Sequence, residues 1–159
     1  MVTGSSNKVA TGTGGDSLAV LNGVSAADVI VRADIAALAN GQLVGLAARY
    51  TGPGLNNGYQ ALLYNSNGTA RASIYRNVNG TWALISADVA VGSVASVLGK
   101  TLHFEAVGSS LKFFLDDATA GTSTLLTFAN DSTFGGPGGV GMRIIGTASL
   151  DNFSFDLLG

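Results

Sequence analysis

Cysteine is absent from this 159-residue chain, and proline occurs only twice. Without cysteine, the protein can have no disulfide scaffold, no thiol nucleophile and no cysteine-ligated metal. No stretch of the sequence approaches 18 consecutive apolar residues, which excludes a membrane-spanning helix. Residues 1–8 also lack the apolar run of a secretory signal. We therefore expect either a segment of a longer protein or a chain that reaches its destination by another route.

Charge is scarce as well. Charged residues make up 11% of the sequence, about half the usual share, and the formal net charge is −2. Proteins that bind nucleic acid need a basic stripe, and the eight basic residues of this chain are scattered. Nucleic acid is thus excluded as a partner. The length fits a single domain, residues 1–159, with room for a hydrophobic core.

Residues that could perform catalysis are few. The chain has one histidine, His103, and one glutamate, Glu105. A Ser-His-Asp arrangement could use only His103, with Asp116 as its acid, and no Gly-x-Ser-x-Gly elbow presents a nucleophile. A surface pair across two strands is the favoured interpretation of these residues. Glycosidases need two carboxylates, and Glu105 has no obvious partner, so we expect no enzyme activity.

Short runs of alternating apolar residues recur about every ten residues, separated by Gly, Asn and Ser clusters, which is typical of an all-β sandwich or barrel. Twelve candidate strands follow this pattern: residues 8–12, 17–22, 27–36, 43–51, 58–65, 69–76, 81–87, 101–108, 111–116, 122–129, 140–145 and 148–157. Two stretches also fit a helix. Residues 25–41 combine a serine cap and alanines with clustered β-branched residues, and residues 89–98 show the same ambiguity.

Two Asn-Gly dipeptides predict tight hairpins, at Asn67-Gly68 and at Asn79-Gly80. Residues that oppose one another across such a hairpin share a face of the sheet. One face of this three-strand meander then carries small aliphatic side chains: Ala61, Leu63, Ala70, Ala72, Ile74, Ala83 and Ile85. The other face is aromatic and polar: Gln60, Tyr64, Arg71, Ser73, Tyr75, Asn77 and Trp82. The aliphatic face is the candidate core face.

A third hairpin is predicted with its turn at Ser109-Ser110, which would place His103 opposite Asp116. Its core face would hold alternate apolar residues: Leu102, Phe104, Ala106, Leu111, Phe113 and Leu115.

The aromatic and polar face is the best candidate for a binding site. Sugar rings have an apolar face that stacks on aromatic side chains, and their hydroxyls need planar polar partners. The candidate ligand-binding residues combine both types: Gln60, Tyr64, Arg71, Tyr75, Asn77 and Trp82. The competing interpretation is a second core layer covered by another strand, and the residues alone do not decide between the two.

Several segments resemble the concanavalin A-like lectin/glucanase jelly rolls, particularly the laminin G-like modules of bacterial surface and secreted proteins. The segments that carry this likeness are residues 44–50, 59–64, 72–82, 111–116, 139–143 and 148–153. The resemblance implies two antiparallel sheets in a jelly roll with little or no helix, and it makes residues 27–36 a strand. It also implies that the concave sheet is the sugar-binding surface.

Some members of that family bind a structural calcium ion through an aspartate on the last strand, which corresponds to Asp151 here. The chain departs from the family pattern because the usual first strand, which pairs with the last, is missing. That absence removes expected calcium ligands and predicts an unpaired strand edge, to which another chain could add a strand.

Two functions follow from the sequence. The first is a non-catalytic carbohydrate-binding or adhesion module, with a glycan or polysaccharide as its partner. The alternative is a self-assembling structural subunit of a filament, surface layer or virion, favoured by sparse charge, abundant glycine and the predicted open edge. Both place the protein outside the cell or on a cell or virion surface, of prokaryotic or viral origin.

Overall fold

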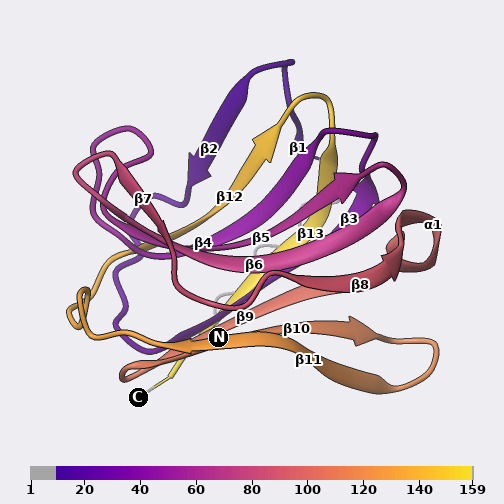
Figure 1. Ribbon diagram of the computed structural model, residues 1–159. Helices are drawn as coiled ribbons and strands as arrows, with labels where there is room; N and C mark the ends of the chain where they lie inside the picture. Colours follow the sequence, from indigo (N-terminus) through magenta and orange to yellow (C-terminus); the bar gives the residue numbers. More distant parts are fainter. Residues whose placement is uncertain (1–9, 159) are drawn as a thin grey trace.

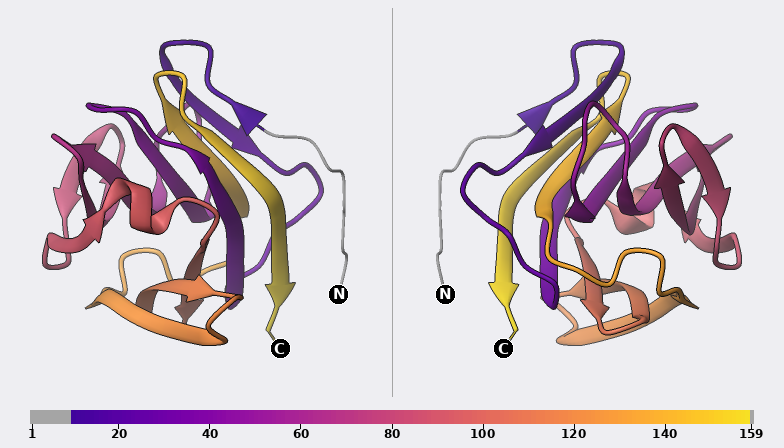
Figure 2. Two further views of the ribbon diagram at one scale, coloured as in Figure 1. Left: turned by 90° about the vertical axis from the view of Figure 1, so that its right-hand side faces the viewer. Right: turned by 90° about the vertical axis from the view of Figure 1, so that its left-hand side faces the viewer.

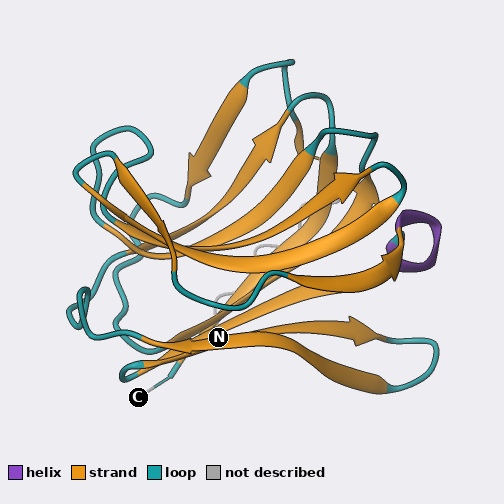
Figure 3. Cartoon of the chain, in the orientation of Figure 1, coloured by secondary structure: helices purple, strands orange, loops and turns teal. Residues whose placement is uncertain are grey.

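A computed structural model describes residues 10–158, which form thirteen strands and one short helix. Two antiparallel sheets pack face to face in a jelly-roll sandwich, as Figures 1 and 2 show. Strand and loop account for almost the whole of the chain in Figure 3. The prediction of an all-β, two-sheet jelly roll is confirmed. Residues 1–9, and with them the start of the candidate strand at 8–12, lie outside the described residues, as does residue 159.

The first sheet has six strands in the order β1-β13-β3-β9-β10-β11. Their bounds are Ala10–Thr11, Ser149–Leu157, Val29–Ala37, Thr101–Val107, Ser110–Asp117 and Thr122–Asn130. The second sheet has the order β2-β12-β4-β5-β6-β7, and β8 pairs with the other half of β6. These bounds are Asp16–Val20, Gly139–Ile145, Leu43–Tyr50, Gly58–Ser66, Thr69–Val78, Thr81–Leu84 and Val89–Ser93.

The hydrophobic core lies between the two sheets and is built from the alternation of each strand. In β3, Val29, Val31, Ala33 and Ile35 are buried, while the residues between them point out of the sandwich. Most of the aliphatic face predicted for the meander belongs to this core: Ala61, Leu63, Ala70, Ala72 and Ile74 are fully buried, and Ile85 packs against them. Ala83, predicted on the same face, is half-buried and lies outside the core cluster.

Both Asn-Gly hairpins form as predicted. Ser66 pairs with Thr69 across the first turn, and Asn77 pairs with Trp82 across the second. All four turn residues have positive φ, between 50° and 90°, which the type I′ turn requires and which Asn and Gly tolerate. In each hairpin the asparagine two residues before the turn accepts a hydrogen bond from the turn glycine: Asn65 from Gly68 N and Asn77 from Gly80 N.

The third hairpin forms, but its predicted turn at Ser109-Ser110 is wrong. Ser110 pairs with Val107, so the turn residues are Gly108 and Ser109, and Gly108 adopts a φ of 57°. Glycine occupies that left-handed region without a steric penalty, which favours this turn over one without glycine. The register moves by two residues, so the core face is unchanged and His103 lies opposite Phe114 rather than Asp116.

The two ambiguous stretches resolve differently. Residues Val29–Ala37 form strand β3, as the resemblance implies. The second stretch divides into strand β8 and a single helical turn, α1 (Val94–Val97). Ser93 caps this turn by accepting a hydrogen bond from Ser96 N. Within residues 10–158, no helix has the length and hydropathy needed to cross a membrane.

Candidate functional site

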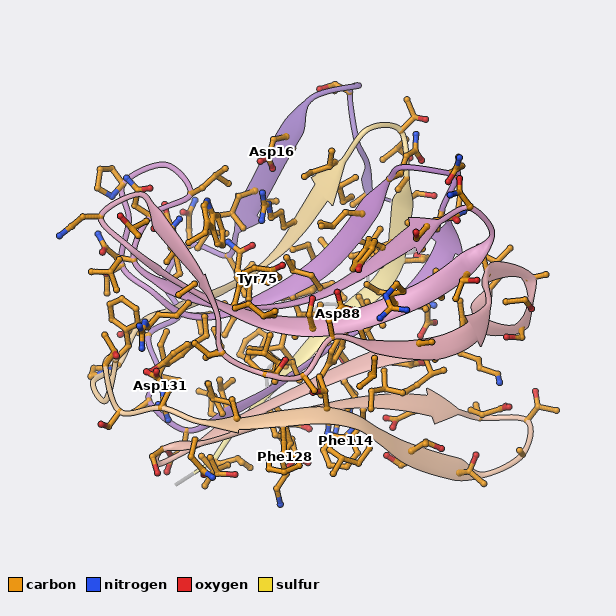
Figure 4. The ribbon with its side chains drawn as sticks, in the orientation of Figure 1. Asp16, Tyr75, Asp88, Phe114, Phe128 and Asp131 are labelled. Carbon is orange, nitrogen blue, oxygen red and sulfur yellow. The ribbon has the colours of Figure 1, made fainter. Side chains whose placement is uncertain are left out.

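A pocket of about 240 Å³ opens on the outer face of the seven-stranded sheet. It lies where β12, β4, β5, β6 and β7 run side by side, the region around the label of Tyr75 in Figure 4. Three aromatic rings, one guanidinium, one hydroxyl and two leucines line it: Tyr64, Tyr75, Trp82, Arg143, Ser73, Leu43 and Leu62. Most small-molecule sites combine apolar walls with a few polar groups in this way.

Arg143 is the most constrained polar side chain of the pocket. Its Nε and Nη2 donate to the two carboxylate oxygens of Asp16 at 3.0 and 2.7 Å, a bidentate pair, and its Nη1 donates to Gln60 Oε1 at 3.2 Å. The guanidinium carbon lies 4.5 Å from the ring centroid of Trp82, within cation–π distance. These contacts fix the guanidinium as one wall of the pocket.

Trp82 and Tyr75 form the aromatic wall. Their ring centroids are 6.3 Å apart with an interplanar angle of 81°, an edge-to-face arrangement. Both side chains are half-buried, so part of each ring faces the solvent side of the sheet. No strand within residues 10–158 covers this face, which contradicts the second core layer considered from the sequence.

Ser73 supplies a polar group with no partner. Its hydroxyl is fully buried, lines the pocket and makes no hydrogen bond within the described residues. A buried hydroxyl without a partner costs about 1 to 3 kcal/mol, and such groups require an explanation in a native fold. A ligand hydroxyl that enters the pocket could satisfy it.

Tyr64 is held at the opposite side of the pocket by Asp88. Its hydroxyl donates to Asp88 Oδ2 at 2.6 Å, and Arg71 Nε donates to Asp88 Oδ1 at 3.0 Å. The hydrogen bond to Asp88, together with partial burial, raises the pKa of Tyr64 above its ordinary value. The Tyr64 ring is thus a neutral, fixed wall of the pocket.

The structure brings together three of the six residues predicted as ligand-binding: Tyr64, Tyr75 and Trp82 line the pocket. Gln60 lies behind them and orients Arg143. Asn77 is buried and caps its own hairpin through Oδ1, and Arg71 pairs with Asp88 outside the lining.

Four lining residues were not predicted: Leu43, Leu62, Ser73 and Arg143. Ser73 was already assigned to the correct face by the hairpin register. Arg143 carries one detectable signal, because it is the only charged residue of an otherwise apolar strand, β12.

The remaining candidates lie away from the pocket. His103 Nδ1 and Nε2 lie 2.8 Å from Asp116 Oδ2 and 2.9 Å from Glu105 Oε1, on the outer face of the six-stranded sheet. With a carboxylate bonded to each ring nitrogen, His103 has no nitrogen left to activate a serine.

The calcium site at Asp151 stays a prediction from the resemblance. Asp151 lies beside Asp34 of β3, but its Oδ1 accepts from Asn152 N, and both oxygens of Asp34 accept from Thr101 and Asn152. Within residues 10–158 no group of three acidic or histidine side chains could hold a metal ion.

The predicted open edge concerns β13. In the described part of the chain, β1 pairs only with Ser149 and Leu150 of this strand. Pairing of another chain with that edge stays a prediction.

The layer arrangement, strand order and pocket define the class of fold: the chain has the concanavalin A-like, lectin-like jelly roll. Many solved structures share this fold, and three of them show its range. The carbohydrate-binding module CBM66 from Bacillus subtilis is 22% identical, with 95% of this chain and 92% of that chain covered and a TM-score of 0.69. A legume lectin-like domain from Entamoeba histolytica is 11% identical, with 95% and 82% covered and a TM-score of 0.59.

Sheep galectin-11 is 13% identical, with 89% of this chain and 98% of that chain covered and a TM-score of 0.50. No protein-family model matches the sequence, and no curated protein matches it. At these identities the likeness concerns the fold alone.

Proposed function

We propose that the protein is a non-catalytic carbohydrate-binding module that takes its glycan in the pocket on the outer face of the seven-stranded sheet. The observation that carries this proposal is the lining itself: three half-buried aromatic rings beside a fixed guanidinium and the unpartnered hydroxyl of Ser73. The aromatic faces suit the C–H face of a sugar ring, while Arg143 and Ser73 suit its hydroxyls.

The pocket size and the neighbouring folds support the same function. A volume of about 240 Å³ is below the range usual for drug-sized ligands, which suits one sugar ring at a time. Two of the similar structures are called a carbohydrate-binding module and a legume lectin-like domain in their own descriptions. The lining contains no carboxylate, whereas glycosidases need a pair of them, and this favours binding over hydrolysis. A glycan-binding role places the protein outside the cell or on a cell or virion surface, where adhesion is one use of it.

Trp82 is the only tryptophan of the chain, so its fluorescence reports on the pocket directly. We expect the emission of the wild-type protein to change in intensity or wavelength during titration with those polysaccharides that bind it on a glycan array. The Ser73→Ala variant should bind the same glycans more weakly, because the hydrogen bond to the sugar hydroxyl is lost. If no glycan on a broad array binds the wild-type protein, the proposal is wrong.

One observation favours self-assembly as a second function. Strand β11 ends the six-stranded sheet, and its nine residues include no charged residue and no proline. Apart from its pairing with β10, β11 makes no backbone hydrogen bond within residues 10–158. Its side chains Phe128 and Leu125 are 60% and 45% exposed. Figure 4 shows Phe128 pointing away from the sandwich. Natural edge strands are more commonly protected by charge or proline.

Antiparallel pairing of β11 with the same strand of a second copy would cover both the edge and the two apolar side chains. We expect the mass from light scattering to rise with protein concentration, and the Phe128→Lys variant to remain monomeric. Val107→Lys is the matched control, because Val107 is exposed on the same sheet but away from this edge. A wild-type protein that stays monomeric at the highest soluble concentration argues against self-assembly.

A further inference from the structure

Every positive charge at the pocket is already paired with a carboxylate. Arg143, the one cation in the lining, has its Nε and Nη2 on the two oxygens of Asp16, and its third contact is to the Gln60 amide oxygen. Its side chain is nearly buried, at 9% exposed. An incoming anion would therefore have to displace Asp16 before it could pair with this guanidinium.

The next cation is paired in the same way. Arg71 donates through Nε to Asp88 Oδ1 at 3.0 Å and through Nη2 to the Asp88 carbonyl at 3.2 Å. Asp88 also accepts the Tyr64 hydroxyl, so its carboxylate is fixed close to the pocket wall. Neither Asp16 nor Asp88 lines the pocket, but each is paired with the arginine beside it, so a negative group in the pocket would find no unpaired cation among residues 10–158.

Placing a carboxylate or sulfate in a partly desolvated site is costly when no cation pairs with it. A neutral sugar meets no such penalty, because its hydroxyls carry no charge and can pair with Ser73.

We propose that the pocket selects uncharged sugars and excludes uronic acids and sialylated or sulfated sugars, and that Asp16 sets this selectivity by neutralising Arg143. The inference rests on the proposed carbohydrate binding and names the ligand class of that same site.

The test compares one polysaccharide in two charge states. A neutral polysaccharide that binds the wild-type protein is oxidised at its primary hydroxyls to carboxylates, and both forms are titrated while the fluorescence of Trp82 is followed. We expect oxidation to weaken binding to the wild-type protein by about tenfold or more. The Asp16→Asn variant leaves Arg143 with its charge unpaired, and we expect it to recover binding of the oxidised form.

Asp156→Asn is the matched control. Asp156 pairs with Arg32 on the other sheet, and its side chain is 36% exposed against 34% for Asp16. This variant should discriminate between the two polysaccharide forms as the wild type does. Circular dichroism of each variant checks that the fold is retained.

Equal affinity of the wild-type protein for the neutral and oxidised forms would overturn the selectivity while the proposed function stands. Discrimination by the wild type without any gain in Asp16→Asn would overturn the role of Asp16. Binding of no neutral polysaccharide would remove the proposed function and the selectivity with it.

Discussion

Replacement of Arg49 by leucine is expected to destabilise the protein by about 2 to 5 kcal/mol, because two carbonyls that accept from this buried guanidinium lose their donors. The Arg49 side chain is 1% exposed. Its Nε donates to the Ala27 carbonyl at 2.6 Å, its Nη1 to the Phe134 carbonyl at 2.9 Å, and its Nη2 to Asp28 Oδ1 at 3.3 Å. Leucine would leave both carbonyls without these donors and Asp28 without its cation.

The hydrogen bonds of Arg49 and Asp28 connect separate segments of the chain, which is why the loss of Arg49 should affect the stability of the whole fold. Asp28 also accepts the Gly108 N–H, so one network joins the start of β3, the β9–β10 turn and the segment before β12. These three segments are far apart in sequence. Arg49 has a φ of 52°, and because leucine and arginine are strained there to a similar degree, the substitution tests the side chain rather than the backbone.

Arg32→Leu is the control for this prediction. Arg32 also lies on a strand and pairs with a single aspartate, Asp156, but their side chains are 29% and 36% exposed. Exposed pairs contribute up to about 1 kcal/mol, so Arg32→Leu should change stability by no more than that. Urea unfolding followed by the fluorescence of Trp82 measures both variants. Similar losses in the two would show that the buried network is not what stabilises this end of the sandwich.

The hairpins could be predicted because their information is local. Asn67-Gly68 and Asn79-Gly80 fix both the turn type and the pairing of the flanking strands, and the side-chain period of two then assigns every residue to a face. From this local information alone, Tyr64, Tyr75 and Trp82 are predicted on one surface of the sheet. The third turn was predicted at Ser109-Ser110, but the observed turn residues are Gly108 and Ser109. The two positions differ by one residue, and the glycine favours the observed turn because it adopts a positive φ without strain.

The rest of the site could not be predicted because it depends on pairings between distant strands. Strand β12 lies between β2 and β4, so Asp16 and Arg143 meet although 127 residues separate them. No turn residue encodes that neighbour relation. Asp88 pairs with Arg71 and holds the Arg71 side chain outside the pocket lining. The sequence gives no sign of this pair, because Asp88 lies in a connection whose course depends on β6 and β8.

Trp82→Ala is expected to have the largest effect on glycan binding. The ring contributes an aromatic wall, orients the Arg143 guanidinium at 4.5 Å and packs edge-on against Tyr75. Truncation of a tryptophan at the centre of a binding site commonly costs 2 kcal/mol or more, which corresponds to a loss of about 30-fold in affinity. Trp82→Phe keeps an aromatic face and should lose less.

Isothermal titration calorimetry with a glycan identified on the array measures this loss without relying on the fluorescence of the removed ring. Phe128→Ala is the control, since it deletes a more exposed aromatic ring from the opposite sheet and should leave the affinity unchanged. A melting curve for each variant separates weaker binding from partial unfolding. Wild-type affinity in a folded Trp82→Ala protein would place the glycan elsewhere, whereas loss in Trp82→Ala with an intact Phe128→Ala would tie recognition to the outer face of the seven-stranded sheet.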